Sequence, residues 1–235
     1  MIMKRKFLFP VVLLLVAVSG AFAQKKVSVL GDSYSTFYGC VTPETNICWY
    51  GVPGEKKEND VTKVEETWWR LLVEKHGLQL ERNNSFSGAT ICNTGYKQAD
   101  FSDRSFITRM GNLGNPDVIL IFGGTNDSWA GVPIGEFQYE GWTKADLYSF
   151  RPAFGYLLAT LKQFYPAARI YNLTNTGLSE EVAASMDEIC RHYGVTNIRL
   201  HDIDKQWGHP SVQGMKSICE QVWEEMIFLN EKPRL

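Results

Sequence analysis

The chain has 235 residues, a length that one globular domain accommodates. Its composition, with 44% hydrophobic and 21% charged residues, excludes disordered, collagen-like and coiled-coil proteins. The formal net charge of −2 leaves no excess of basic residues for nucleic acid or anionic lipid, so we expect neither as a partner.

Residues 1–23 have the three parts of an export signal. Basic residues at 4–6 precede an apolar run over 7–18, and Ala21-Phe22-Ala23 follows as a small-x-small cleavage motif. We expect cleavage after Ala23, which makes residues 24–235 a single mature domain that is periplasmic or secreted. A retained membrane anchor is the less favoured alternative, because the apolar run is shorter than the roughly 20 residues of a membrane span.

Five cysteines in an oxidising compartment permit two disulfides and leave one thiol over. Cys40 and Cys48 share one polar loop, and we predict that they form a disulfide. Cys190 and Cys219 fall on apolar faces of two expected helices, where a bridge and simple burial are both open. Neither the cysteines nor the four histidines have the spacing of a zinc site, so no metal is expected.

Apolar runs typical of buried strands alternate with helical patterns along the mature chain. The expected elements, in order, are a strand at 26–30, a helix at 65–76, strands at 79–84 and 117–122, a helix at 151–165, a strand at 169–173, a helix at 179–193, a strand at 196–201 and a helix at 212–230. Alternation of this kind favours parallel strands joined by right-handed crossovers. We therefore predict a three-layer α/β/α sandwich with a mostly parallel five-stranded sheet.

Ligands of such sheets bind beyond the carboxyl ends of the strands, so the residues that follow each strand are the candidates for chemistry. Gly31-Asp32-Ser33-Tyr34-Ser35 follows the first strand, where a serine hydroxyl is exposed beside backbone N–H groups. Gly88 follows the second strand and allows its amide to approach a ligand closely. Gly123-Gly124-Thr125-Asn126-Asp127 follows the third, and His209-Pro210 precedes the last helix. Each segment alone is also an ordinary turn.

Together, in this order, the four segments resemble the SGNH, or GDSL, hydrolase family. The segment around Ser33 matches its first block, Gly88 its second, Gly123 to Asp127 its third and His209-Pro210 its fifth, over roughly residues 26 to 228. The resemblance implies a flavodoxin-like sandwich and ester hydrolysis. It further implies that Ser33 is the nucleophile and His209 the general base, and that the Ser33 and Gly88 amides and the Asn126 side chain stabilise the oxyanion.

The chemistry of ester hydrolysis by a serine requires the same groups: a hydroxyl, an imidazole base and oxyanion donors. A serine hydroxyl is a poor nucleophile until a neighbouring imidazole accepts its proton, and histidine can accept and return a proton near neutral pH. Each donor preset toward a tetrahedral oxyanion contributes about 3–4 kcal/mol. Acyl transfer by serine needs no metal or organic cofactor, so none is expected.

The chain departs from the family three residues before His209, where an acid is usual and Gln206 stands. We predict a Ser33–His209 dyad whose imidazole is oriented by Gln206 or by the backbone near it. The alternatives are that Asp204 or Asp202 reaches the ring, or that the site is inactive. A solvated or helix-capping role is the simpler interpretation of both aspartates.

The substrate is the part that the sequence indicates least. Two long loops, 39–64 and 128–150, bring aromatic residues toward the carboxyl edge of the sheet, and aromatic faces in a polar cleft suit a sugar ring. We predict that Trp129 and Trp142 contact the substrate, with Asp32 as a further candidate. The other aromatic candidates are Trp49, Tyr50 and Tyr139, and the alternative is that all of these rings pin their own loops.

Three functions are consistent with these residues. The first is an esterase that removes O-acetyl or other short acyl groups from carbohydrate. The second is a lipid or thioester hydrolase, which needs a larger apolar surface than these loops offer. The third is a non-catalytic sugar-binding protein on an esterase scaffold, which Gln206 alone suggests.

Overall fold

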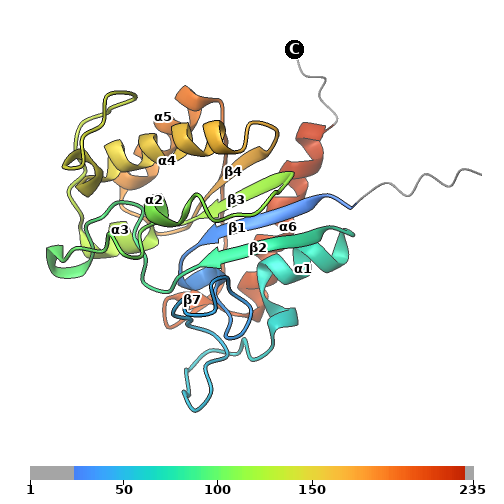
Figure 1. Ribbon diagram of the computed structural model, residues 1–235. Helices are drawn as coiled ribbons and strands as arrows, with labels where there is room; N and C mark the ends of the chain where they lie inside the picture. The colour runs from blue at the N-terminus through green and yellow to red at the C-terminus, as the bar shows by residue number, and fades with distance from the viewer. Residues whose placement is uncertain (1–23, 231–235) are drawn as a thin grey trace, which may run out of the picture.

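The computed structural model describes residues 24–230, so the predicted signal peptide at 1–23 lies outside the described residues (Figure 1). The strands are β1 (Lys26–Gly31), β2 (Gln79–Ser85), β3 (Val118–Phe122), β4 (Arg169–Thr174), β5 (Thr196–Arg199), β6 (Lys205–Gln206) and β7 (His209–Pro210). The α-helices are α1 (Trp68–Lys75), α2 (Phe106–Arg109), α3 (Thr125–Ala130), α4 (Phe150–Phe164), α5 (Glu180–Tyr193) and α6 (Val212–Asn230). Four short 3₁₀ helices complete the list: η1 (Ser33–Ser35), η2 (Val64–Glu66), η3 (Tyr96–Gln98) and η4 (Asp146–Tyr148).

Five parallel strands form one sheet in the order β2-β1-β3-β4-β5, which confirms the predicted fold class. Every residue of β3 is buried, as its continuous apolar run predicts for a central strand covered on both faces. Helices α4 and α5 cover one face, and α1 and α6 cover the other (Figure 1). The sheet therefore separates two hydrophobic cores.

The long helices have their expected limits because local signals set them. Ser179 caps α5 by accepting the Val182 N–H at 3.4 Å, and Gly194 ends it in the left-handed conformation. Helix α1 begins later than expected, because Thr67 is extended and a 3₁₀ turn occupies the residues before it. Helices α2 and α3 and the β6–β7 hairpin were not predicted, since each is too short to show a period.

All five cysteines are free in the described residues, so the predicted Cys40–Cys48 disulfide is not found. The Cys48 thiol contacts the Asn46 carbonyl oxygen at 3.6 Å, and the loop is already tied by the hydrogen bond from the Cys40 N–H to the Phe37 carbonyl at 2.9 Å. Burial and the nearby Cys40 thiol raise the pKa of Cys48 to about 11, which disfavours the reactive thiolate.

Cys190 and Cys219 are both buried, one in the core under α4 and α5 and the other in the core under α1 and α6. The sheet lies between them, so they act as small buried hydrophobes and not as a bridged pair.

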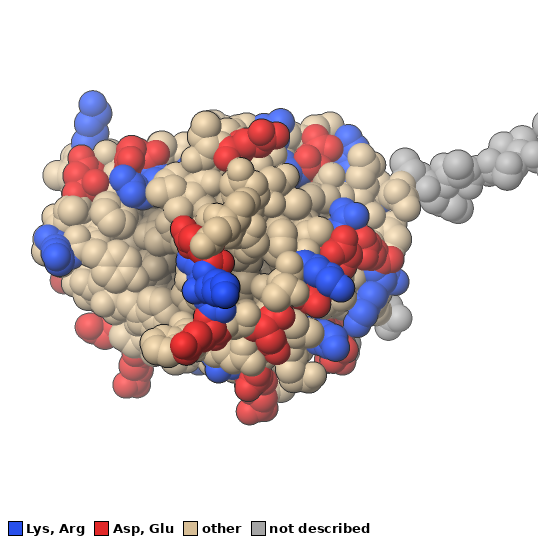
Figure 2. All heavy atoms as spheres, turned by 90° about the horizontal axis from the view of Figure 1, so that it is seen from below, with Lys and Arg blue, Asp and Glu red and all other residues tan. Residues whose placement is uncertain are grey.

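The outer surface is mixed in charge. Figure 2 shows positive and negative side chains interspersed on the face seen from below, with neutral residues between them. Over residues 24–230, no helix has both the length and the apolar character needed to cross a membrane.

Candidate active site

Ser33 lies where β1 ends, as the first residue of the 3₁₀ helix η1. Asp32 caps this turn by accepting the Tyr34 N–H at 3.0 Å through its carboxylate. Asp32 is 1% exposed and its carboxyl pKa is raised to about 7, mainly by burial. Substrate contact was predicted for Asp32, and that prediction is wrong, because the side chain is turned into the protein to hold the Ser33 turn.

His209 reaches Ser33 from a tight hairpin. Strands β6 and β7 are antiparallel and are joined by Trp207 and Gly208, whose φ angles of 52° and 74° are those of a type I′ turn. The His209 Nε2 atom lies 2.9 Å from Ser33 Oγ, and Nδ1 lies 3.2 Å from the Trp207 carbonyl oxygen. With the proton on Nδ1 donated to that carbonyl, Nε2 is free to accept the Ser33 proton.

The backbone near Gln206 therefore orients the imidazole, and neither predicted side chain does. The Gln206 side-chain oxygen accepts the Asp60 N–H at 2.8 Å. Asp204 is exposed and accepts the Ser211 hydroxyl, which in turn accepts the Gly214 N–H in the first turn of α6. Asp204 thus supports a helix cap, the simpler of its two interpretations.

The surroundings of His209 keep its ring neutral. The Trp49 indole stacks on the imidazole with ring centroids 3.7 Å apart and planes 6° apart. Burial lowers the His209 pKa to about 4, and the nearby charges of Lys57 and Lys205 lower it in the same direction. The hydrogen bond to the Trp207 carbonyl opposes this shift. The ring is therefore available as a base at neutral pH.

Side-chain hydrogen bonds that the sequence did not predict hold the hairpin in register with Ser33. The Tyr34 hydroxyl donates to the Gly208 carbonyl, and the Tyr50 hydroxyl donates to the Pro210 carbonyl at 2.9 Å. The Asn59 side-chain amide also donates to the Pro210 carbonyl, at 3.1 Å. These bonds explain why the loop before η2 lies beside β7 at the carboxyl end of the sheet (Figure 1).

The three groups predicted as oxyanion donors lie in the segments that follow β1, β2 and β3. Among the described residues, the Ser33 and Gly88 N–H groups have no acceptor. Gly88 has a φ of 82°, a conformation that favours glycine. The Asn126 side-chain amide donates to the Ala89 carbonyl at 3.0 Å, which leaves its second hydrogen for a ligand.

Asp127 links the segment that carries Gly88 to the helix that carries Asn126, a role that its position in the sequence did not reveal. Its carboxylate accepts the Ile91 N–H at 2.8 Å and the Cys92 N–H at 3.2 Å, so it ties the segment after Gly88 to helix α3. Burial raises its pKa to about 6, against the effect of these hydrogen bonds.

Arg109 fixes the strand ends beneath the site. Its buried guanidinium donates to the Gly31 carbonyl at 3.1 Å and to the Asn84 carbonyl, so it links the carboxyl ends of β1 and β2. Burial lowers its pKa to about 9, so the group keeps its charge at neutral pH, and the charge of Asp32 favours that state.

The aromatic residues of the second long loop divide into two groups. Trp129 is 48% exposed and its ring centroid is 6.2 Å from that of His209, so it lies beside His209, and its contact with the substrate stays a prediction. Trp142 instead packs on Tyr156 of α4 with a centroid distance of 5.4 Å, and Tyr139 stacks on His192 of α5 at 3.7 Å. The prediction for Trp142 is therefore wrong, and these two rings pin their own loop.

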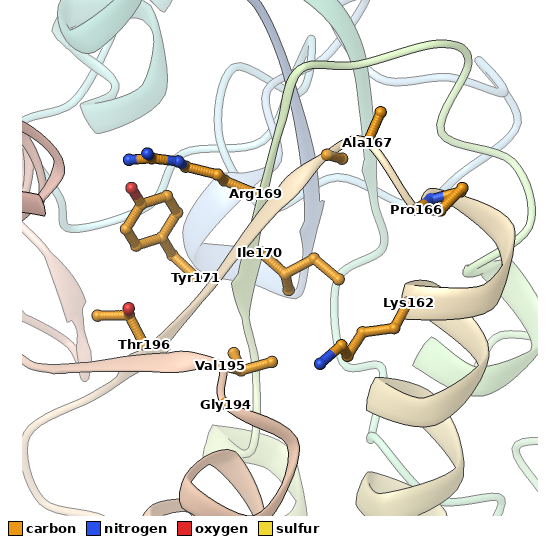
Figure 3. Close-up of a pocket in the computed structure, with 10 residues that line it drawn as sticks. Lys162, Pro166, Ala167, Arg169, Ile170, Tyr171, Gly194, Val195 and Thr196 are labelled. Carbon is orange, nitrogen blue, oxygen red and sulfur yellow. The ribbon is translucent and has the colours of Figure 1, made fainter. Parts of the chain in front are cut away.

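A cavity of about 340 Å³ is lined by Lys57, Glu58, Trp207 and Trp49, the last of which stacks on His209. Trp207 is 74% exposed here, although its backbone carbonyl serves the His209 ring. Another cavity of about 340 Å³ lies at the opposite end of the sheet, where β4 and β5 begin (Figure 3). Lys162 on its wall donates to the Tyr193 carbonyl at 2.6 Å, and neither Ser33, His209 nor the candidate oxyanion donors line this cavity.

The arrangement contains groups that acyl transfer uses: a hydroxyl bonded to a neutral imidazole, and hydrogen-bond donors in the segments that follow β1, β2 and β3. Within residues 24–230, no group of three or more His, Cys, Asp or Glu side chains is placed to hold a metal ion.

Comparison with known proteins identifies the family. The model of the GDSL-like Lipase/Acylhydrolase family matches residues 25–226. A protein described as a GDSL-like lipase from Bacteroides uniformis ATCC 8492 is 78% identical, with 87% of this chain and 96% of that chain covered and a TM-score of 0.86. A second, from Bacteroides ovatus ATCC 8483, is 55% identical, with 88% and 99% covered and the same TM-score of 0.86.

More distant structures share the fold. A family two carbohydrate esterase from Clostridium thermocellum, solved in complex with cellohexaose, is 16% identical, with 88% of this chain and 64% of that chain covered and a TM-score of 0.60. A search of the curated proteins found no match. The family match and the two similar Bacteroides structures show that the chain belongs to the GDSL-like lipase/acylhydrolase family, and is a GDSL-like hydrolase.

Proposed function

We propose that the chain is an exported serine esterase that removes acetyl or other short acyl groups from carbohydrate. The observation that carries this proposal is the contact between Ser33 Oγ and His209 Nε2 at 2.9 Å, with Nδ1 of the same ring held by the Trp207 carbonyl. A neutral imidazole in this tautomer is the base that a serine nucleophile needs.

The reaction follows from these positions. Ser33 Oγ attacks the ester carbonyl carbon while His209 Nε2 takes the hydroxyl proton. The carbonyl oxygen becomes an oxyanion, which receives hydrogen bonds from the Ser33 and Gly88 N–H groups and the Asn126 amide. The tetrahedral intermediate then collapses, the bond to the alcohol breaks, and His209 returns the proton to the departing oxygen. A water molecule repeats the sequence on the acyl-serine.

Exposed aromatic rings beside small polar groups favour a carbohydrate as the alcohol. Trp207 and Trp129 are the most exposed tryptophans near His209, and Lys57 and Glu58 line the same cavity as Trp207. Indole faces pack against the C–H faces of a sugar, while charged side chains bond its hydroxyls. The fold shared with a carbohydrate esterase bound to cellohexaose supports this choice of substrate class.

Export is proposed from the signal pattern of residues 1–23. If the pattern acts as proposed, the full chain expressed in a Gram-negative host will appear in the periplasm or medium with Gln24 at its N-terminus. Mass spectrometry of the intact protein measures this directly, and a cytoplasmic protein that still begins at residue 1 would contradict it.

The activity is tested on p-nitrophenyl acetate, butyrate and octanoate with the wild type, Ser33→Ala and His209→Ala. His192→Ala is a matched control, because that ring packs on Tyr139 and does not contact Ser33. We expect hydrolysis that falls with acyl length, abolished in the first two variants and retained in the control. Activity that rises with acyl length would instead indicate a lipid hydrolase.

Acetylated xylo- and cello-oligosaccharides then test the alcohol, with released acetate as the readout. Binding of these sugars by a wild type that hydrolyses no ester would favour the non-catalytic sugar-binding alternative. Hydrolysis of p-nitrophenyl acetate without any activity on the acetylated sugars would show that the proposed substrate class is wrong, while the proposed esterase activity would stand.

A further inference from the structure

Tyr96 contacts the candidate oxyanion donor Asn126 from a segment that no family motif includes. Its hydroxyl donates a hydrogen bond to Asn126 Oδ1 at 2.8 Å. The Nδ2 atom of the same amide donates to the Ala89 carbonyl at 3.0 Å. Both ends of the Asn126 amide are therefore held, by Ala89 and Tyr96 of the connection between β2 and α2.

The turn that carries Tyr96 is constrained. Gly95 donates its N–H to the Ala99 carbonyl at 2.8 Å, which closes the turn around η3. Lys97 and Gln98 both have a φ of 57°, a conformation that costs free energy for residues other than glycine. The Gln98 side chain donates to the Gly131 carbonyl at 3.3 Å, which joins the turn to the end of α3. Helix α3 also carries Asn126, so the turn of Tyr96 is bonded to the helix that holds the donor.

The Tyr96 hydroxyl faces the site and retains its proton. The side chain is 37% exposed, and its ring centroid is 6.4 Å from that of Phe101 behind it. Burial, with the nearby charges of Asp32 and Asp127, raises the pKa of Tyr96 to about 12. The hydroxyl is therefore a hydrogen-bond donor throughout the pH range of an esterase assay.

A bond to the amide oxygen changes what the amide nitrogen can do. Donation to Oδ1 draws electron density from Nδ2, so the free N–H becomes a stronger donor, since bonds in a chain polarise one another. The same bond restricts rotation of the Asn126 side chain, so the N–H is already aimed when negative charge develops. A stronger N–H donor gains most where negative charge develops on the oxygen, which is in the transition state.

We propose that Tyr96 is a positioning residue that orients and polarises Asn126 as the oxyanion donor. This inference rests on the proposed esterase activity. It assigns to Tyr96 a role that shows in kcat more than in KM, because substrate binding does not depend on the strength of the Asn126 N–H.

The test is a double-mutant cycle on p-nitrophenyl acetate with Tyr96→Phe, Asn126→Ala and the double variant. We expect Tyr96→Phe to lower kcat about tenfold, the equivalent of one hydrogen bond, with KM changed less than about twofold. Asn126→Ala should lower kcat by about 10²-fold or more, which leaves a measurable rate. In that background, Tyr96→Phe should have no further effect.

Tyr165→Phe is the matched control. Its hydroxyl donates to the Met110 backbone carbonyl at 3.3 Å and accepts the Leu113 N–H at 3.1 Å, at the C-terminal end of α4. It should keep kcat while its melting temperature falls about as much as that of Tyr96→Phe. Equal kcat for Tyr96→Phe and the wild type, or the same loss with Asn126 present and absent, would overturn the inference. A wild type that does not hydrolyse the ester, or an active Ser33→Ala, would overturn the proposed function itself.

Discussion

The acid limb of the pH–rate profile tests the environment of His209 directly. The ring accepts a proton from Ser33 only when it is neutral, and burial lowers its pKa to about 4. For a histidine with the ordinary pKa of about 6.5, only about a tenth of the rings would be neutral at pH 5.5. With a pKa of about 4, nearly all rings are neutral there. We therefore expect kcat/KM to stay constant down to about pH 5 and to reach half its maximum near pH 4.

Trp49→Ala should shift the pH midpoint of this acid limb. The indole covers one face of His209 at 3.7 Å, so its removal admits water and stabilises the imidazolium. We expect the midpoint of the acid limb to rise by about one pH unit or more toward 6.5. Trp49→Phe is the control, because a phenyl ring still covers the imidazole and should keep the midpoint near that of the wild type.

Unfolding must be separated from protonation in this assay. His209 has a folded pKa below its unfolded value, so its contribution to stability is lost as the pH falls from about 6.5 to about 4, by on the order of 3 kcal/mol. Asp32 has a folded pKa of about 7, above its unfolded value, so its contribution grows as the pH falls from 7 toward 4. The two contributions oppose each other, and circular dichroism at each pH confirms that the protein is folded. A wild-type midpoint near 6.5, or an identical midpoint in Trp49→Ala, would refute the reasoning.

Three further variants test the supports of the site. Gln206→Ala should keep kcat within about threefold and lower the free energy of unfolding by about 1 kcal/mol, because it removes only the acceptor of the Asp60 N–H; a tenfold loss of kcat would restore Gln206 as the orienting group. Arg109→Met should cost about 3 kcal/mol in urea unfolding, since it removes the guanidinium that donates to the carbonyls of Gly31, Asn84 and Arg104; near-wild-type stability would contradict that role. Trp129→Ala should raise KM several-fold for acetylated oligosaccharides and less than twofold for p-nitrophenyl acetate; equal effects on both substrates would remove Trp129 from sugar binding.

The strands and long helices were predictable because each has a period or an apolar run long enough to stand out. The five strands of the sheet begin and end within two residues of their predicted limits, as the run at β3 illustrates. Ser33, Gly88 and Asn126 were predictable for a different reason, since the carboxyl ends of parallel strands meet at one edge. The structure brings their donors to that edge with His209.

The other features of the site depend on backbone groups and tertiary packing, which the identity of a side chain does not reveal. The group that orients His209 is the backbone carbonyl of Trp207, and every residue has a carbonyl, so no motif could single it out. Trp129 and Trp142 have the same chemistry in the same loop, yet only tertiary packing decides that one flanks His209 and the other packs on α4. Asp32 was a candidate for substrate contact, whereas its short side chain accepts a backbone N–H of the turn.

The Trp207 carbonyl also explains how a site without an acid retains a defined geometry. The carbonyl and the His209 ring lie two residues apart in a turn whose φ angles of 52° and 74° fix their relation, so orientation is a local property of the hairpin. A carboxylate in this position would raise the His209 pKa by stabilising the imidazolium, and it would itself have to be buried, at a cost in free energy. The neutral carbonyl avoids that cost and keeps the correct tautomer. It stabilises the charged ring less during attack, so more of the barrier must be lowered by the oxyanion donors. The hydrogen bonds that fix Asn126 on both sides therefore matter more here than they would beside a complete triad.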